Sequence, residues 1–266
     1  STVNPFMFLR DLFGAFVIVG VLIAIYRRFI LKVPRLFSNA MDIYAILIVA
    51  VIILSGIFLE ASKMVAYSDY KRMVDEYSGL SEPEELKSLE AYWVKEFGTI
   101  SPNLKGPFDE KILQKGKELH QSNCGNCHAR PQWAFVSYGT AKIISPIGLG
   151  IDRAHLPSVL WYIHVLACLV GLAYLPLSKM FHIFASSVRL LANGVIGKEK
   201  LTPANQATLQ AMELDACTHC GTCSLRCSVI MAFEEFTNMN IFPSEKIASI
   251  RALASGKELS PQELRH

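Results

Sequence analysis

Residues 156–185 read LPSVLWYIHVLACLVGLAYLPLSKMFHIFA, a long apolar run that contains two histidines. A helix needs about 20 mostly apolar residues to cross a bilayer core roughly 30 Å thick, and this run is long enough to cross with some tilt. Pro176 is expected to kink the helix, because proline has no N–H to donate. An ionisable side chain inside a span is a candidate functional residue, so His164 and His182 raise the first question about this chain.

Two earlier stretches are equally apolar. Residues 12–26 read LFGAFVIVGVLIAIY, and residues 42–60 read DIYAILIVAVIILSGIFLE. Of the 266 residues, 52% are hydrophobic and 18% are charged. Because the apolar residues are concentrated in blocks, they indicate membrane spans rather than one large soluble core. The sequence therefore predicts an all-α membrane protein with three transmembrane helices.

Lysine and arginine in short loops predict the orientation of the spans. The segments that follow the first and third spans are rich in them: Arg27, Arg28, Lys32, Arg35, Lys179, Arg189, Lys198 and Lys200. We expect these segments on the cytoplasmic side of the inner membrane of a prokaryote, with the N-terminus periplasmic. The regions expected are two transmembrane helices in 1–60, a periplasmic segment in 61–155, a third transmembrane helix in 156–192 and a cytoplasmic ferredoxin-like segment in 193–266.

Two short helices are predicted in the periplasmic segment. Residues 81–97 read SEPEELKSLEAYWVKEF, in which Ser81 and Glu84 have the spacing of a capping box. Residues 108–120 read FDEKILQKGKELH, which predicts an amphipathic helix. This second helix leads directly into a cysteine motif.

The motif CGNCH occupies residues 124–128. Thiols at the spacing of Cys124 and Cys127 can add to the vinyl groups of a haem, and His128 then ligates the iron. A zinc site or a simple disulfide is the alternative interpretation. Residues 116–131 resemble the first helix and haem motif of a small cytochrome c, which implies one covalently bound haem c. Four residues are candidates for the second axial ligand, and the sequence favours none of them: His120, His155, Met64 and Met73.

A second cysteine motif, CTHCGTCSLRC, contains Cys217, Cys220, Cys223 and Cys227. This C-x2-C-x2-C-x3-C run predicts a [4Fe–4S] cluster, whereas a zinc site usually needs two separated C-x-x-C pairs. In two-cluster ferredoxins the fourth cysteine ligates the other cluster. Because no cysteine follows Cys227 in the sequence, either Cys227 completes a single cluster, or a partner subunit or a longer chain completes the site. We expect the chain to be a fragment of a longer protein.

His164 and His182 are eighteen residues apart, which on one helix is about five turns and about 27 Å of rise. Both would then face the same side, near opposite membrane surfaces, as ligands of two stacked b-type haems. The alternative is that His164 bonds a neighbouring carbonyl and His182 lies at the interface. A bis-histidine haem needs a second imidazole, and the first two spans contain no histidine. Other subunits or further helices are therefore expected to supply the partner histidines.

Three stretches resemble known membrane redox proteins. Residues 12–60, with YRR, VPR and MDIYAILIVAVIILSG, resemble the third and fourth helices of the cytochrome b subunit (gamma chain) of respiratory nitrate reductase. Residues 156–185 resemble its fifth helix, including the histidine spacing, although that subunit lacks a haem c segment. Residues 217–266 resemble the small iron–sulfur subunit of heterodisulfide reductases, in CTHCGTCSLRC and NIFPSEKIASIRALASGKELSPQEL. Fusions of this kind occur in DsrM-like subunits of heterodisulfide-reductase-like membrane complexes.

The resemblance implies a membrane electron-transfer subunit of a quinone-linked respiratory oxidoreductase complex. It implies that His164 and His182 ligate two b-type haems, shared with other helices, and that electrons pass between menaquinone, haems b and c, and a cytoplasmic [4Fe–4S] centre. The partners implied are a cytoplasmic heterodisulfide-reductase-like iron–sulfur catalytic subunit and the quinone pool, with a periplasmic cytochrome c as a further candidate. A membrane anchor or redox sensor without turnover of its own is the alternative function.

The sequence gives little support to other functions. The net charge of +3 without a basic run argues against a nucleic-acid partner. No nucleophile–base set is evident, so no catalytic residue is assigned, and the chain is expected to contribute to an enzyme as an oxidoreductase subunit. Asp42 and Glu60, at the ends of the second span, are interpreted as interfacial anchors and as weaker candidates for a proton path.

Overall fold

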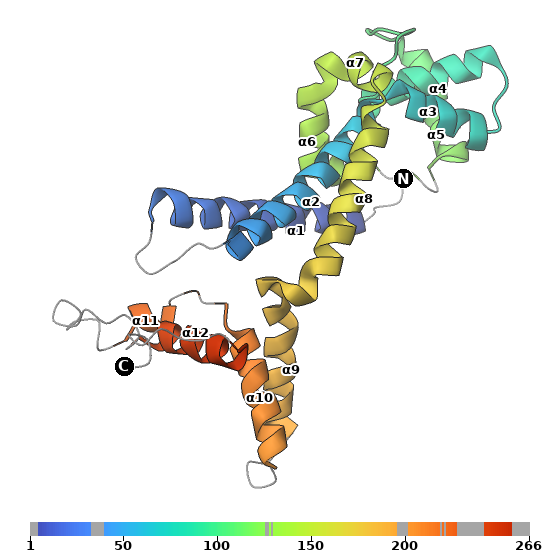
Figure 1. The fold of residues 1–266 in the computed structure, drawn as a ribbon. Coiled ribbons are helices and arrows are strands. Elements are labelled where there is room, and N and C mark those ends of the chain that lie inside the picture. The colour runs from blue at the N-terminus through green and yellow to red at the C-terminus, as the bar shows by residue number, and fades with distance from the viewer. Residues whose placement is uncertain are drawn as a thin grey trace. The chain divides into compact units, whose positions relative to one another are not determined.

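The computed structural model describes residues 5–32, 40–125, 128, 130–195, 202–218, 220, 222–227 and 242–256. Over this part of the chain every regular element is helical, as Figure 1 shows, and this confirms the all-α prediction. The α-helices are α1 (Pro5–Ile25), α2 (Ala40–Val65), α3 (Tyr67–Tyr77), α4 (Pro83–Glu96), α5 (Glu110–Asn123), α6 (Phe135–Ile144), α7 (Gly148–Arg153), α8 (Leu156–Tyr174), α9 (His182–Val195), α10 (Pro203–Ala216), α11 (Thr222–Leu225) and α12 (Pro243–Ala254). The turns between them are a π-helical turn, η1 (Tyr26–Ile30), and the 3₁₀ turns η2 (Pro131–Trp133), η3 (Ser145–Ile147), η4 (Leu175–Leu177) and η5 (Lys179–Phe181).

Within the described ranges, three helical segments are long and apolar enough to cross a membrane: Phe6–Ile30, Ala40–Val65 and Leu156–Leu177. This confirms the prediction of three transmembrane helices and indicates a membrane location. Large apolar side chains on these helices, such as Phe13 and Leu166, are exposed on the isolated chain, as side chains that contact lipid are. The sidedness of the spans stays a prediction.

The third span is shorter than predicted. Helix α8 ends at Tyr174, and Ser178 adopts an extended conformation before α9 begins at His182. Proline cannot donate a backbone hydrogen bond, so Pro176 ends the helix instead of kinking it. The Ser178 hydroxyl then accepts from the Met180 N–H at 3.2 Å and starts a new turn. The prediction of one continuous helix over 156–192 carrying both histidines is therefore wrong, because His164 and His182 lie on separate helices.

The chain divides into two compact units, of which the first comprises residues 1–22 and 48–170. In this unit the predicted helices over 81–97 and 108–120 are confirmed as α4 and α5, and Figure 1 shows them beside α3. The predicted capping box is wrong, because Glu82 is the N-cap of α4 and its helix starts at a proline. Proline suits this first helical position, where its missing N–H would have no partner anyway.

The core of the first unit is a cluster of buried side chains from α3, α4 and the end of α5: Tyr70, Val74, Leu89, Trp93, Phe97 and Cys124. Helix α5 approaches α4 at Gly116, where a Cβ atom would come closer than 3.0 Å to the Ser88 carbonyl oxygen. A glycine is needed at this position because any side chain would push the two helices apart. A second cluster joins the end of α2 to α6 through Ala61, Val65 and Ala141.

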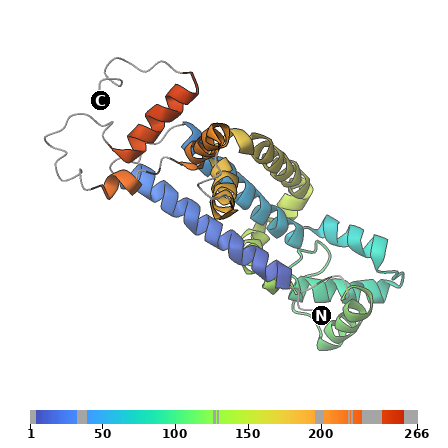
Figure 2. The same ribbon diagram turned by 90° about the horizontal axis from the view of Figure 1, so that it is seen from below.

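The second unit comprises residues 23–47 and 171–266. Figures 1 and 2 show α9 and α10 side by side within it. Arg189 of α9 forms an ion pair with Glu213 of α10. The short helix α11 is joined to the start of α12 by a hydrogen bond between the buried hydroxyls of Ser224 and Ser244.

Candidate functional site

A cavity of about 390 Å³ lies beside His128 in the first unit, and we call it the His128 cavity. Its wall comes from α1, α2, α3 and α4 and from the residues that follow α5. The lining residues are Met7, Glu60, Lys63, Met64, Asp69, Tyr70, Arg72, Met73, Trp93, Phe97, Thr99, His128 and Pro131. Ligand pockets in proteins commonly have volumes of roughly 300–1,000 Å³ and mostly apolar walls, so the cavity has the size and character of a ligand site.

Helix α5 places the predicted haem motif against this cavity. The Cys124 N–H donates to the His120 carbonyl, and the His128 N–H donates to the Cys124 carbonyl, each at 2.9 Å. Cys124 is buried in the α3–α5 core, and His128 reaches the cavity one turn later. Cys127 lies outside the described residues. Of the two described members of the motif, His128 therefore lies in the wall of the cavity and Cys124 lies in the core behind it.

Aromatic rings form one wall around His128. The Trp93 ring lies 5.4 Å from the His128 ring at 75°, and it stacks on Phe97 with ring centres 4.2 Å apart. The indole N–H of Trp93 is buried and has no hydrogen-bond partner among the described residues. A buried donor without an acceptor costs about 1–3 kcal/mol.

Both histidines of this region are neutral at neutral pH. Burial lowers the pKa of His120 to about 4, with a smaller contribution from the nearby His128. Burial also lowers the pKa of His128. A metal ligand must be a neutral imidazole with an unprotonated nitrogen, so His128 is in the protonation state that ligation requires.

The residues fit a haem c. The donor set contains a thiol and a neutral imidazole in adjoining turns, and the imidazole lies beside a cavity with a mostly apolar wall. The four candidates for the second axial ligand differ in whether they line the His128 cavity. Met64 and Met73 line the His128 cavity, whereas His120 and His155 do not. His155 is exposed between α7 and α8, with a positive φ of 50°.

A second cavity of about 400 Å³ lies beside His164, and we call it the His164 cavity. It is lined by Arg10, Asp11, Gly14, Ile52, Ile53, Gly56, Ile57, Leu59, Glu60, Lys63, Ser137 and His164. The floor is apolar, and the charged side chains come from the ends of α1 and α2. Glu60 and Lys63 of α2 line both cavities, and the His128 cavity also adjoins the α3–α5 core.

His164 is held by α2. Its Nδ1 lies 3.1 Å from the Ile52 carbonyl oxygen and 3.0 Å from the Ser55 hydroxyl. Because a carbonyl oxygen accepts only, this contact requires the proton on Nδ1, which leaves Nε2 of a neutral ring unprotonated. A Cβ atom on Gly56 would lie 3.1 Å from the imidazole Cε1, so the glycine makes room for the ring. The contact with the Ile52 carbonyl matches the alternative interpretation, in which His164 bonds a neighbouring carbonyl. Histidines that ligate a metal also commonly donate their other ring N–H to a backbone carbonyl.

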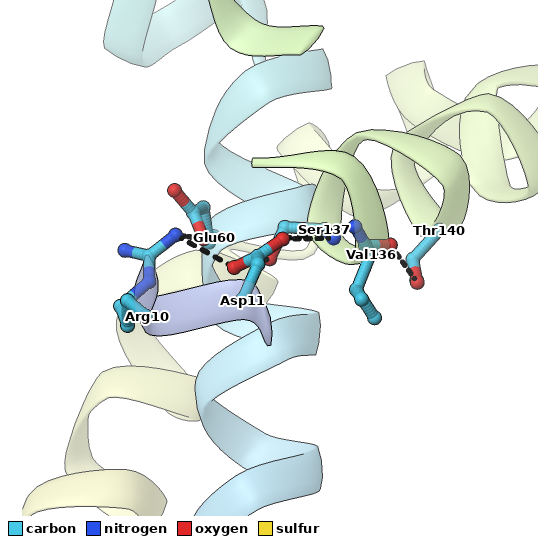
Figure 3. Close-up of polar contacts among 6 residues, drawn as sticks. All are labelled: Arg10, Asp11, Glu60, Val136, Ser137 and Thr140. Atoms are coloured by element: carbon cyan, nitrogen blue, oxygen red, sulfur yellow. Dashed lines mark hydrogen bonds and ion pairs between the residues drawn. The ribbon is translucent and has the colours of Figure 1, made fainter. Parts of the chain in front are cut away.

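Polar contacts fix α1 to its neighbours at the edge of this cavity, as Figure 3 shows. The buried Asp11 carboxylate accepts from the N–H groups of Val136 and Ser137 at 2.9 and 3.0 Å, at the start of α6. Arg10 bridges Asp11 and Glu60. A carboxylate at a helix N-terminus satisfies amide groups that have no partner within the helix.

Glu60 and Asp42 are both in ion pairs. Asp42, in the second unit, is buried and lies 3.1 Å from the Arg28 guanidinium and 3.0 Å from the Lys179 ammonium. These contacts fit the interpretation of both carboxylates as anchors at the ends of the spans. In the same unit His182 Nδ1 contacts the Lys179 carbonyl at 2.7 Å, in the first turn of α9.

The cysteines of the second motif are more exposed than Cys124. Cys220 and Cys223 are exposed, and Cys217 and Cys227 are half-buried. The Cys227 N–H donates to the Ser224 carbonyl at 3.3 Å, which closes the turn after α11. Over the described ranges, the structure gathers no group of three or more His, Cys, Asp or Glu side chains that could hold a metal ion.

Several residues that shape these sites carry no motif in the sequence. Trp93 and Asp11 were not singled out, because their importance depends on contacts with segments far away along the chain. Ser55 and Gly56, inside the apolar α2, are a local signal that could have indicated the contact with α8. Small residues in a span often lie against a neighbouring helix.

The fold and the apolar helices define the chain as an all-helical membrane protein. No family model, no curated protein and no solved structure matches it.

Proposed function

We propose that this chain is a membrane electron-transfer subunit of a quinone-linked respiratory oxidoreductase complex. The observation that carries the proposal is the C-x-x-C-H motif, whose His128 lines a cavity with a mostly apolar wall and whose Cys124 is buried in the adjoining core. A haem bound there would supply one-electron transfer at its iron. Such a group needs covalent anchors, an imidazole and exclusion of water, and these residues offer all three.

His128 and Trp93 have separate roles in this proposal. His128 presents an imidazole that burial keeps neutral, and helix α5 fixes its backbone through the Cys124 carbonyl. The aromatic wall of Trp93 and Phe97 excludes water from one side of the cavity, which lowers the local polarity. Electron transfer between sites requires fixed distances, and a motif held by packed helices provides them.

His164 is proposed as a ligand of a b-type haem, whose second imidazole would come from another helix or subunit. Support comes from the orientation of its ring, with Nδ1 held 3.1 Å from the Ile52 carbonyl oxygen of α2, and from the cavity beside it. The corresponding role of His182 rests on the resemblance of its sequence to a cytochrome b. The ion-paired Arg10 and Glu60 fix α1 to α2 at the edge of the His164 cavity.

The cysteine run from Cys217 to Cys227 is proposed to hold a [4Fe–4S] cluster on the cytoplasmic side. Electrons would pass between this cluster and a heterodisulfide-reductase-like partner, and between the haems and menaquinone. The spacing of the four thiols supports this part of the proposal. The N-terminus and residues 61–155 would face the periplasm, as the positive charges of the loops predict.

The test is a reduced-minus-oxidised spectrum of membranes that contain the full chain together with its partner subunits. Addition of a menaquinol analogue should produce both b-type and c-type absorption bands. In His164→Leu the b-type absorbance should fall while the c-type band stays, and Leu169→Ala, a change of an exposed side chain on the same helix, should leave both unchanged. Absence of both bands in the unmodified protein would contradict the proposal.

A further inference from the structure

Three methionines line the His128 cavity: Met7, Met64 and Met73. A thioether sulfur is a strong-field partner for haem iron opposite an imidazole, and this ligand pair raises the reduction potential of cytochromes c. A methionine beside an imidazole within one mostly apolar cavity is therefore more than a packing residue. The inference that follows rests on the proposed function, because it concerns a haem at His128.

The two other histidines of this region do not line the cavity. His120 is 3% exposed, and its ring packs against Tyr92, Trp93 and Phe97. His155 is exposed at the junction of α7 and α8. A ligand must reach the iron from the face opposite His128, so a donor outside the cavity wall would first have to leave its present position.

The three methionines differ in what they pack against. Met73 lies on α3 and packs on the buried cluster that contains Cys124. Met64 lies in the last turn of α2 and packs on the cluster of Ala61, Val65 and Ala141. Met7 belongs to the first turn of the transmembrane helix α1. Met73 thus shares the cavity with His128 and the hydrophobic core with the cysteine that would anchor the haem.

We propose that Met73 is the second axial ligand of a haem c at His128. Its neighbours on α3, Tyr70 and Val74, are buried in the same core and hold this helix in place. The unbranched methionine side chain has three rotatable bonds, so it can direct its sulfur to the iron without a backbone movement. The α3 helix is therefore part of the haem c site, although it precedes the haem motif by some fifty residues (124 − 73 = 51).

The experiment uses the full chain, matured in a host that attaches c-type haem, with three variants. The unmodified oxidised protein should be low-spin and show the weak far-red charge-transfer band of methionine–iron ligation. Met73→Leu should lose this band, become high-spin and bind carbon monoxide when reduced. Met64→Leu, a matched change in the same cavity, should behave as the unmodified protein. Met73→His should lose the band but stay low-spin, with a lower midpoint potential.

The outcomes separate this inference from the proposed function. If covalent haem is absent from the unmodified protein, the proposed function fails, and the ligand assignment fails with it. If covalent haem is present and the band is missing, or the band survives in Met73→Leu, the assignment of Met73 is overturned while the proposed function stands. If Met73→Leu holds no haem, Met73→His decides, since a competent nitrogen ligand at residue 73 restores a low-spin haem only when this position faces the iron.

Discussion

The two cysteine motifs of this chain differ in how far the polypeptide prepares them. Cys124 is buried in a core built by α3, α4 and α5, next to a cavity that adjoins His128. In the second motif Cys220 and Cys223 are exposed, and α11, which contains Cys223, spans four residues. The first site is supported by packed helices, whereas the thiols of the second motif are exposed or half-buried.

This difference follows the needs of the two proposed cofactors. A haem is larger than any side chain, so its pocket must be formed by several elements that pack independently. An iron–sulfur cluster is wrapped by a short run of backbone, and its binding is coupled to the folding of that run. In this proposal the C-x-x-C-H motif depends on tertiary structure, and the second cysteine motif depends on its cofactor.

The largest effect is expected for Cys223→Ser. The EPR signal of the reduced [4Fe–4S] centre should be lost, and α11 and α12 should become accessible to protease, because cluster binding and local folding are coupled. The c-type haem should stay at its normal level. Cys168→Ser, on α8 and outside both motifs, is the control and should change neither property. Continued protection of α11 and α12 without a cluster would end the contrast between the motifs.

A smaller effect is expected for Gly116→Ala, which tests the helical support of the first motif. The new methyl group would overlap the Ser88 carbonyl oxygen, and overpacking of this kind costs about 1–3 kcal/mol. Amide hydrogen exchange along α5 should become faster, and less haem c should be attached.

The control for this change is Gly139→Ala on α6, where a Cβ atom would have nothing within 4 Å. Alanine favours a helix over glycine by roughly 0.5–1 kcal/mol, so exchange along α6 should slow or stay the same. If Gly116→Ala also leaves exchange along α5 unchanged, the close approach of α4 and α5 does not support the site.

The contact of α1 with α6 should contribute somewhat less. Asp11→Asn removes the charge of a buried carboxylate that accepts from two α6 amides and pairs with Arg10, and weakening these charge-assisted contacts costs about 1–2 kcal/mol. Exchange of the Val136 and Ser137 amides should become faster. Asp109→Asn, at the exposed N-cap of α5, is the control, because asparagine caps helices as well as aspartate does. Equal effects of the two changes would show that burial of Asp11 is unimportant.

The smallest effect is expected in the second unit for Glu213→Gln. Glu213 is 52% exposed, and an exposed ion pair of the kind it forms with Arg189 is worth about 0–1 kcal/mol. Protection of α9 and α10 should change little, and added salt should reduce any difference between the two proteins. A large loss of protection would mean that this helix pair depends on charge rather than on packing.

Apolar length was sufficient to predict the three spans, and amphipathic spacing was sufficient to predict α4 and α5. The end of α8 was missed because residues 180–185 are again mostly apolar, while the helix is ended by the backbone at Pro176 and Ser178. The start of α4 was assigned one residue early, since proline at the first helical position competes with a serine cap. The conformation of the chain at prolines thus overrode the hydrophobic pattern.

The candidate sites were predicted only where the chemistry is local in sequence. Cys124 and His128 follow from a five-residue motif, and Met73 was one of four candidates without a basis for choice. Met73 lines the His128 cavity and His120 does not. That cavity is built by α1–α4 and by residues after α5, and no local pattern encodes contacts between such distant segments. The orientation of His164 likewise depends on the backbone carbonyl of Ile52. Every residue has a backbone carbonyl, so no sequence pattern identifies this one as a partner.

The central claim is that Cys124, Cys127 and His128 hold a covalent haem beside the His128 cavity. The direct measurement is acid–acetone extraction of the purified full chain, followed by a pyridine haemochrome spectrum of the precipitated polypeptide. The account predicts that a c-type haem stays with the polypeptide, and that a Cys124→Ser, Cys127→Ser double variant loses it. A polypeptide that releases all of its haem on extraction would contradict the account.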